Sequence, residues 1–261
     1  MERDYWLRQK NGTPLFPDIE WSRPENRMQA GKLLIVGGNS YGFAAPAEAF
    51  AVAARAGIGT TRIMLPDMVR KIVGNAVDHA EFAPSTPSGS FGQKALNELL
   101  LAANWADAVL VAGDLGRNSE TAILLEKFLA KSPVPVALTK DAVDYVVTSP
   151  QTVLHRPGTL VVLSLSQLQR LAIAAKAPRP ITFSMGILHL VEWLHDFTAT
   201  YEISLVVKHL DTILVAVSGQ VSTTKKKEDM PIWRVRTAAK SVVWWLQSPT
   251  KPFEALTSAV F

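Results

Sequence analysis

Short apolar runs alternate with amphipathic stretches along most of this chain. From residue 31 onward, apolar runs predict strands at 33–36, 60–65, 77–82, 108–112, 134–138, 160–163, 203–208 and 212–217. Helical patterns lie between most of them, at about 46–56, 92–104, 119–130, 164–175, 185–197 and 233–247. Strands buried on both faces are continuous apolar runs, and helices connect them when they are parallel. The pattern therefore predicts an α/β fold with three α/β/α layers and a mostly parallel central sheet.

Two segments depart from this alternation. Residues 1–30 contain Pro14, Pro17 and Pro24 and show no sustained periodicity, so we expect an extended N-terminal segment with at most a short helix. One domain is expected to follow, over residues 31–261. Inside that domain, residues 222–232 have the most loop-like composition.

The composition of the chain excludes several kinds of functional site and a membrane-spanning protein. The chain has 261 residues, of which 48% are hydrophobic, and it has no cysteine. Disulfides, thiolate metal sites and a cysteine nucleophile are therefore excluded. No stretch approaches the roughly 18 uninterrupted apolar residues of a membrane-spanning helix, so we expect no membrane association and a cytoplasmic location.

Nucleic-acid and metal binding are not expected. The formal net charge is only +4, and the basic run at 225–227 is followed at once by Glu228 and Asp229. Lysines in such a loop are usually solvated. The histidines show no metal-binding spacing, so we expect no metal-ligating residues.

The segment GKLLIVGGNSYGFAAPAEAFAVAARAGIG, at 31–59, is typical of a strand, a glycine turn and a helix. Such a unit presents backbone N–H groups to an anionic ligand. In doubly wound folds, ligands lie beyond the carboxyl ends of the strands. This rule favours the loops around Asn39, Asp114, Asp141 and His209 as the ligand site.

Four motifs follow one another in the chain. They are Gly38-Asn39-Ser40-Tyr41 with Ala44-Ala45 and Arg55-Ala56-Gly57-Ile58-Gly59, then Ala112-Gly113-Asp114-Leu115-Gly116, Thr139-Lys140-Asp141, and Lys208-His209-Leu210-Asp211-Thr212. In this order they resemble the ribokinase-like family of ADP- or ATP-dependent NAD(P)H-hydrate dehydratases, over nearly all of residues 30–261. The resemblance implies a ribokinase-like fold and the repair of hydrated nicotinamide dinucleotides, by phosphorylation of the ring hydroxyl and elimination of phosphate.

The resemblance also assigns roles to single residues. It implies that Lys208 and Thr212 contact a nucleotide, ATP or ADP with Mg²⁺ if activity remains. The loops that contact the nicotinamide dinucleotide in the family are represented by a second group of residues: Asn39, Ser40, Ala45, Asp114, Gly116 and Asp141.

The reaction, however, needs groups that this chain lacks. The family has a Gly-Ser-Gly-Asp turn before its last helix, whereas this chain has Ile232-Trp233-Arg234-Val235-Arg236. Bulky side chains there block a phosphate from the backbone, and the catalytic acid is missing. Asp114 replaces a loop glycine and Thr139 replaces an acid. We therefore assign no catalytic residue and expect a degenerate, inactive homologue that at most binds a nucleotide or dinucleotide.

Two alternatives remain open at this point. One is an active dehydratase that uses a relocated acid, such as Asp229 or Asp114, and the other is a divergent small-molecule kinase. Both need a phosphate-binding turn. The last predicted helix contains the apolar run Val242-Val243-Trp244-Trp245-Leu246, which is typical of a helix buried in a core or against another subunit. Since family members commonly assemble, we expect a homo-oligomer.

Overall fold

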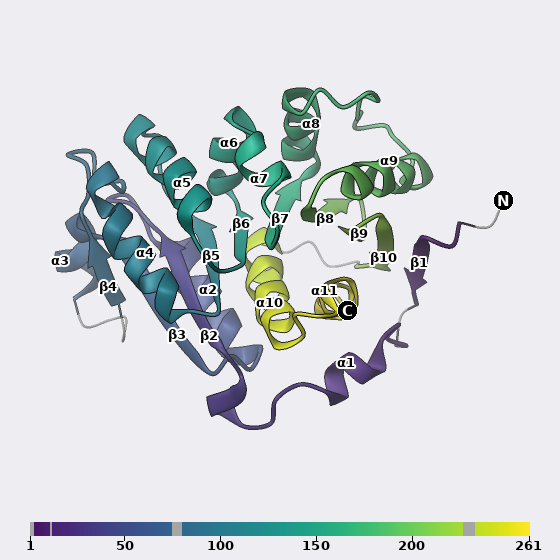
Figure 1. Cartoon of the computed structure of the whole chain (residues 1–261), viewed down its shortest axis with the longest axis horizontal. Helices are drawn as coiled ribbons and strands as arrows, with labels where there is room; N and C mark the ends of the chain where they lie inside the picture. Colours follow the sequence, from purple (N-terminus) through teal and green to yellow (C-terminus); the bar gives the residue numbers. More distant parts are fainter. Residues whose placement is uncertain (1–2, 11, 75–79, 227–232) are drawn as a thin grey trace.

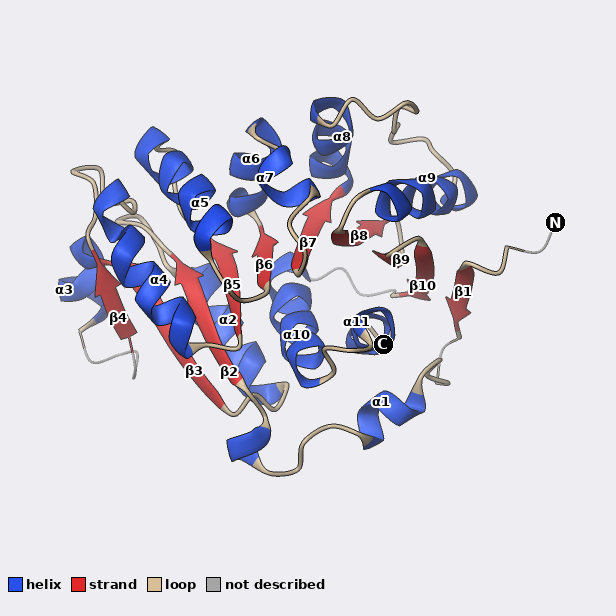
Figure 2. Ribbon diagram, in the orientation of Figure 1, coloured by secondary structure: helices blue, strands red, loops and turns tan. Residues whose placement is uncertain are grey.

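A ten-stranded sheet lies between two layers of helices in the computed structural model of the chain (Figures 1 and 2). The structure describes residues 3–10, 12–74, 80–226 and 233–261. The strands, in chain order, are β1 (Trp6–Gln9), β2 (Lys32–Gly37), β3 (Thr60–Pro66), β4 (Ala80–Ala83), β5 (Ala108–Gly113), β6 (Val136–Thr139), β7 (Thr159–Ser164), β8 (Ile203–His209), β9 (Thr212–Val217) and β10 (Gln220–Lys225).

The helices connect these strands in the order that the alternating pattern predicts. They are α1 (Pro17–Trp21), α2 (Ala44–Arg55), α3 (Arg70–Val73), α4 (Leu96–Trp105), α5 (Ser119–Lys131), α6 (Asp141–Thr148), α7 (Gln151–Leu154), α8 (Leu165–Ala174), α9 (Ile187–Thr200), α10 (Trp233–Gln247) and α11 (Pro252–Ala259). The prediction of a mostly parallel three-layer α/β/α fold is confirmed.

The order of the strands determines where a ligand can bind. Across the sheet it is β1-β10-β9-β8-β7-β6-β5-β2-β3-β4, and β9 runs antiparallel to both of its neighbours. From β2 the chain proceeds outward through β3 and β4, and then returns to β5 on the other side of β2. Such a reversal opens a crevice at the carboxyl ends of the two neighbouring strands. Here it brings the loops that follow Gly37 and Gly113 side by side.

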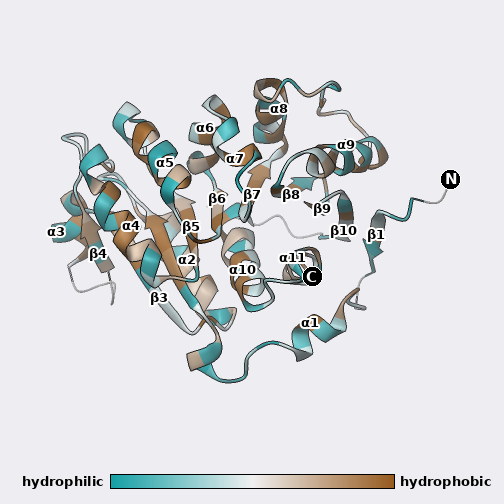
Figure 3. Ribbon diagram, in the orientation of Figure 1, coloured by the Kyte–Doolittle hydropathy of each residue, from teal (hydrophilic) through white to brown (hydrophobic). Residues whose placement is uncertain are grey.

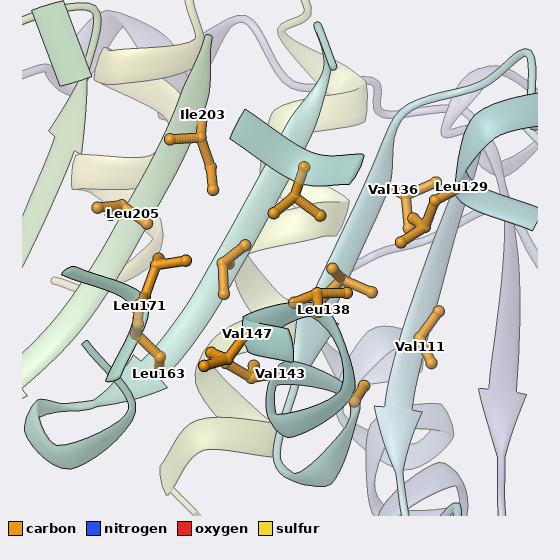
Figure 4. Packing of buried hydrophobic residues seen from close by; sticks show 14 of the residues in the cluster. Val111, Leu129, Val136, Leu138, Val143, Val147, Leu163, Leu171, Ile203 and Leu205 are labelled. Carbon is orange, nitrogen blue, oxygen red and sulfur yellow. The ribbon is translucent and has the colours of Figure 1, made fainter. Parts of the chain in front are cut away.

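Each face of the sheet carries its own hydrophobic core. Helices α4, α5, α6, α8 and α9 cover one face, and α2, α10 and α11 cover the other. The central strands are mostly hydrophobic along their length (Figure 3), and nearly all residues of β5, β6 and β7 are buried. On the first face, Leu138 and Leu163 pack against Val143 and Val147 of α6 (Figure 4). Both cores make the strand ends rigid supports for the loops above them.

Residues 222–225 were expected to form a loop, and this expectation is wrong. They belong to β10, which pairs with β9 and, in parallel, with β1. Three of its six residues are Ser or Thr and only Val221 is apolar, so the apolar pattern of a strand is missing. Their hydroxyls are satisfied by long-range partners instead: Trp6 Nε1 donates to Thr223 Oγ1 over 3.1 Å, and Ser222 Oγ lies 2.7 Å from Thr257 Oγ1.

The N-terminal segment contains a short helix, α1, as expected, and also β1 at one edge of the sheet. The helical patterns predicted from the sequence do not include α3, α6, α7 or α11. The predicted strand 77–82 corresponds to β4, and residues 77–79 lie outside the described part. Within the described ranges, no helix is both long and apolar enough to cross a membrane.

Helix α10 is buried within the chain itself. Val242 and Val243 are fully buried, and Trp244 and Trp245 keep only 7% of their surface exposed. The helix packs on β5, β6 and β7 between α2 and α11. The first four residues of its apolar run are thus buried within this chain itself, and Leu246 is partly buried.

Candidate functional site

Two glycine loops meet at the point where the strand order reverses. The N–H of Gly38 donates to the carbonyl oxygen of Gly113 over 3.0 Å. A Cβ atom built on Gly37 would lie 2.5 Å from that same oxygen, which is closer than any side chain tolerates. These glycines therefore allow the two backbones to approach, and they place Asn39 beside Asp114.

Asp114 occupies the N-terminus of α2. Its backbone is left-handed, with φ of 57°. Its Oδ2 accepts a hydrogen bond from the N–H of Ala45 over 2.7 Å, and its Oδ1 lies 2.5 Å from Nζ of Lys140. The residue before α2, Phe43, provides no side-chain cap. A carboxylate from another loop thus takes the position where a helix N-terminus attracts an anion.

Asn39 and Ser40 tie the first loop to its neighbours. Asn39 Nδ2 donates to the carbonyl oxygen of Asp114 over 2.6 Å, while Asn39 Oδ1 accepts from the N–H of Tyr41 over 2.7 Å. Ser40 Oγ donates to the carbonyl oxygen of Ser88 over 3.0 Å. The polar atoms of these two side chains are therefore engaged within the chain.

The carboxylate of Asp141 accepts hydrogen bonds from the loop that follows β5. Its Oδ2 accepts hydrogen bonds from the N–H groups of Leu115, over 2.8 Å, and Gly116, over 3.2 Å. Its Oδ1 is buried and has no hydrogen-bond partner. Burial raises the pKa of this carboxyl group, the bond from Leu115 lowers it, and the nearby charge of Asp114 raises it further. A buried acid with a raised pKa and one oxygen without a partner is a candidate proton acceptor at this edge of the sheet.

Arg234 and Gln167 form a hydrogen-bonded pair next to these loops, at the carboxyl-end edge of the sheet. Nη1 of Arg234, in the first turn of α10, donates to Oε1 of Gln167 over 2.8 Å. Gln167 Nε2 in turn donates to the carbonyl oxygen of Lys140 and to Oδ1 of Asp144, over 2.7 and 2.8 Å. Burial lowers the pKa of Arg234, and the charges of Asp144 and Asp141 raise it. A cation of the protein thus lies where the resemblance places the phosphate-binding turn.

A pocket lies on the other side of the same turn of α10. It has a volume of about 360 Å³ and is lined by parts of α2, α10, α11 and the ends of β8 and β9. Five of its lining residues are cationic, and no acidic residue lines it in the part of the chain that the structure describes: the five are Arg55, Lys208, Lys226, Arg236 and Lys240. We call this the basic pocket. Val52, Ile213, Trp233 and Val260 contribute apolar surface to it.

The structure separates the two groups of residues that the sequence singled out. Asn39, Ala45, Asp114, Gly116 and Asp141 lie together beyond the carboxyl ends of β2 and β5, and Ser40 lies in the adjoining loop. Lys208 lines the basic pocket. Thr212 is buried in β9, where its hydroxyl donates to Asp211 Oδ1 over 3.1 Å, and it does not line that pocket.

Several residues of these sites escaped the sequence analysis. No role could be assigned to Lys140, Gln167 and Lys240 from the sequence. Only the structure shows that Lys140 binds Asp114, that Gln167 binds Arg234 and that Lys240 lines the basic pocket. Gln167 carries one local signal, because with Ser164 it forms a capping box at the start of α8. Asp229, a candidate acid, lies outside the described residues. Among the described residues there is no group of three or more His, Asp or Glu that could hold a metal ion.

Comparisons with known proteins identify the fold. No protein-family model matches the sequence, and no curated protein matches it. A ribokinase-like superfamily protein from Enterococcus faecalis superposes with a TM-score of 0.72 and 14% identity, covering 100% of this chain and 86% of its own. An ADP/ATP-dependent NAD(P)H-hydrate dehydratase from Bacillus subtilis, co-crystallised with ATP and Mg²⁺, gives 0.65 and 14%, covering 97% and 87%.

A pyridoxal kinase from Staphylococcus aureus, in complex with AMP-PCP and pyridoxal, superposes with a TM-score of 0.55 and 14% identity, covering 88% of this chain and 84% of its own. The chain therefore has the ribokinase-like fold, and it is similar in structure to NAD(P)H-hydrate dehydratases and to kinases of that superfamily. At this level of identity the likeness concerns the fold.

Proposed function

We propose that this chain is a non-catalytic homologue of the NAD(P)H-hydrate dehydratases that has kept a nucleotide-binding pocket. The observation that carries the proposal is the carboxylate of Asp114 on the N–H of Ala45. An anionic substrate that approached α2 would have to displace this carboxylate, which Lys140 also holds. Two negative charges a few ångströms apart repel each other by several kcal/mol in a partly dry site, on the order of what substrate binding gains.

The position of Arg234 supports the same conclusion. Phosphoryl transfer needs a base for the attacking hydroxyl and bare N–H groups for the phosphate. Here the first turn of α10 carries Trp233 and Arg234 instead, and the guanidinium of Arg234 is bound to Gln167. A neighbouring carboxylate, Asp144, shares that glutamine. The polar side chains at this edge of the sheet are thus hydrogen-bonded to one another within the chain.

The basic pocket supports the nucleotide-binding half of the proposal. Its volume lies within the roughly 300–1,000 Å³ of small-molecule sites, and it combines cationic with apolar and aromatic lining. Lys208 lies at the end of β8 and lines the basic pocket. The similar B. subtilis dehydratase was crystallised with ATP. We expect a nucleotide to bind this chain in the same region, in contact with Lys208.

The experiment is a turnover assay on the purified chain. The protein is incubated with ATP or ADP, Mg²⁺ and hydrated NADH, and the recovery of NADH is followed by its absorbance, with the B. subtilis dehydratase as the active control. We expect no recovery above the rate without protein. Thermal denaturation with and without nucleotide then measures binding, because a ligand at 100 times its Kd adds about 2.7 kcal/mol of stability.

One observation favours a second candidate, an active nucleotide-dependent enzyme. Asp141 has a buried oxygen without a partner and a raised pKa, which are properties of a general base. If the chain does turn over hydrated NADH, Asp141→Asn should abolish the activity, since the amide keeps an acceptor for Leu115 and Gly116 but cannot take a proton. Turnover that depends on this carboxyl would replace the non-catalytic proposal.

A further inference from the structure

The last turn of α11 forms part of the wall of the basic pocket. Ala259, the last residue of this helix, and Val260, its C-cap residue, both line the pocket, next to Ile213 of β9. An α-helix leaves its last four carbonyl groups without partners inside the helix, and helix ends fray. The position of this wall therefore depends on contacts that reach the last turn of α11 from other segments.

Gln9 of β1 supplies such a contact. Its Nε2 donates to the carbonyl oxygen of Thr257, in the last turn of α11, over 3.3 Å, and to Thr224 Oγ1, in β10, over 3.1 Å. Its Oε1 accepts from the N–H of Leu15 over 3.3 Å. Gln9 keeps only 5% of its surface exposed, and Thr257 is fully buried. Breaking one of these bonds leaves a buried polar group unsatisfied, so the amide fixes the spacing between α11 and β10.

The partners of Gln9 lie directly behind the pocket lining. Thr224 is paired with Ile213 across the strands, and Thr257 precedes Ala259 by two residues in α11. Gln9 and its two partners are not among the described residues that line the pocket. They are thus placed to position the wall without touching a ligand.

The other contacts of this N-terminal segment lie away from α11. Arg3 Nη2 donates to Glu192 Oε1, in α9, over 2.6 Å, and the ring of Tyr5 is stacked on that of His195, with the centroids 3.7 Å apart. Strand β1 pairs in parallel with β10 at the edge of the sheet (Figure 1). We call residues 3–9 the N-terminal strap. Loss of the Arg3 contact weakens the docking of the strap and leaves the bonds of its last residue to the pocket wall in place.

We infer that the N-terminal strap is part of the nucleotide site and that Gln9 is a positioning residue, which holds the last turn of α11 where it completes the basic pocket. The inference rests on the nucleotide binding proposed above. It adds that docking of the strap and binding of a nucleotide favour each other, because both need the same position of α11. Such coupling is reciprocal, so a bound nucleotide must also stabilise the strap.

Isothermal titration of the whole chain with ATP tests the role of Gln9. Gln9→Leu removes the amide, and we expect it to weaken ATP binding about tenfold, as it does if the wall keeps its present position in about a tenth of the molecules. Arg3→Met is the matched control in the same strap, and it should bind ATP within about twofold of the wild type, because a partly exposed ion pair contributes little. Equal affinities for the two variants would contradict the inference.

A double-mutant cycle shows whether Gln9 acts through its hydrogen bonds. Thr224→Val removes only the hydroxyl to which Gln9 donates. Alone it should weaken ATP binding about threefold, the effect of one neutral hydrogen bond, and this milder change also carries the test if Gln9→Leu does not fold. Combined with Gln9→Leu it should add no further loss, since the bond is already absent. Losses that multiply in the double variant would mean that the two residues act independently.

Amide hydrogen exchange tests the coupling in the reverse direction. Saturating ATP should slow the exchange of β1 several-fold in the wild type, although the strand does not line the pocket. The same ATP occupancy should leave the exchange of β1 unchanged in Gln9→Leu. A merely structural glutamine would alter exchange without ATP and leave this response to ATP in place. Exchange of β1 that does not respond to ATP in the wild type would overturn the inference.

The outcomes distinguish this inference from the proposed function. If the wild type does not bind ATP at all, the nucleotide-binding half of the proposal is refuted, and the inference with it. If the wild type and Gln9→Leu bind ATP equally well, only the inference is refuted. Turnover of hydrated NADH would refute only the non-catalytic half of the proposal. Circular dichroism and a thermal midpoint show that each variant is folded at the temperature of the titration.

Discussion

Removal of the Asp114 carboxylate is the sharpest test of whether this side chain occupies the anion-binding end of α2. Asp114→Ala removes two interactions at once, the acceptor for the Ala45 N–H and the partner of Lys140. Asp114→Asn is the matched control, because its amide oxygen still accepts from Ala45 and asparagine tolerates a left-handed backbone. The two variants therefore differ mainly in the cap on α2.

The expected loss follows from the geometry. A missing helix cap costs about 1 kcal/mol. The ion pair is worth about 1 kcal/mol at the upper end of exposed pairs, since the Lys140 and Asp114 side chains keep 29% and 19% of their surface. Alanine at φ of 57° relieves none of the backbone strain. The Ala variant should thus lose about 2 kcal/mol, and the Asn variant about 1 kcal/mol or less.

Equilibrium unfolding in urea at neutral pH measures both losses. Phosphate adds a second readout, because Asp114→Ala frees the α2 N-terminus and Lys140 for an external anion. Phosphate should therefore stabilise the Ala variant more than the wild type or the Asn variant. Equal stabilities of the two variants, or the same response of all three proteins to phosphate, would show that Asp114 does not occupy an anion site.

Three further predictions concern single positions. Because the folded pKa of Lys240 lies below its unfolded value of 10.5, the unfolded chain holds more protons in alkaline solution. The wild type should gain stability relative to Lys240→Met as the pH rises toward 10.5, which urea unfolding at several pH values would detect. The pKa of Asp141 is raised in the folded chain, so above its unfolded value of 3.8 the folded chain holds more protons than the unfolded chain. As the pH rises above 3.8, the wild type should therefore lose stability relative to Asp141→Asn. Thermal denaturation at several acidic pH values would measure this loss. Gly37→Ala places a methyl group 2.5 Å from the oxygen of Gly113 and should cost about 2 kcal/mol or more in the same unfolding assay.

The local part of the fold could be predicted from the residues alone. Strands such as β5 and β8 are buried on both faces, so their apolar runs stand out in the sequence. Strands β1 and β10 could not be found in this way. They lie at the far edge of the sheet, and β10 is stabilised by hydroxyl contacts with Trp6 and Thr257, which are distant in the chain.

The sequence alone determined the alternation of strands and helices in a mostly parallel three-layer fold, and it determined that the residues before the last helix lack the glycines of a Gly-Ser-Gly-Asp turn. Both follow from local chemistry, because hydrophobic periodicity and the presence of glycine act within a few residues. Only the tertiary structure decided which side chains lie at the N-terminus of α2 and at the start of α10. Contacts between distant segments depend on where the sheet places each loop, which no local pattern encodes. Examples are the hydrogen bonds of Asp114 with Ala45 and of Arg234 with Gln167, and the position of Lys240 near Lys226.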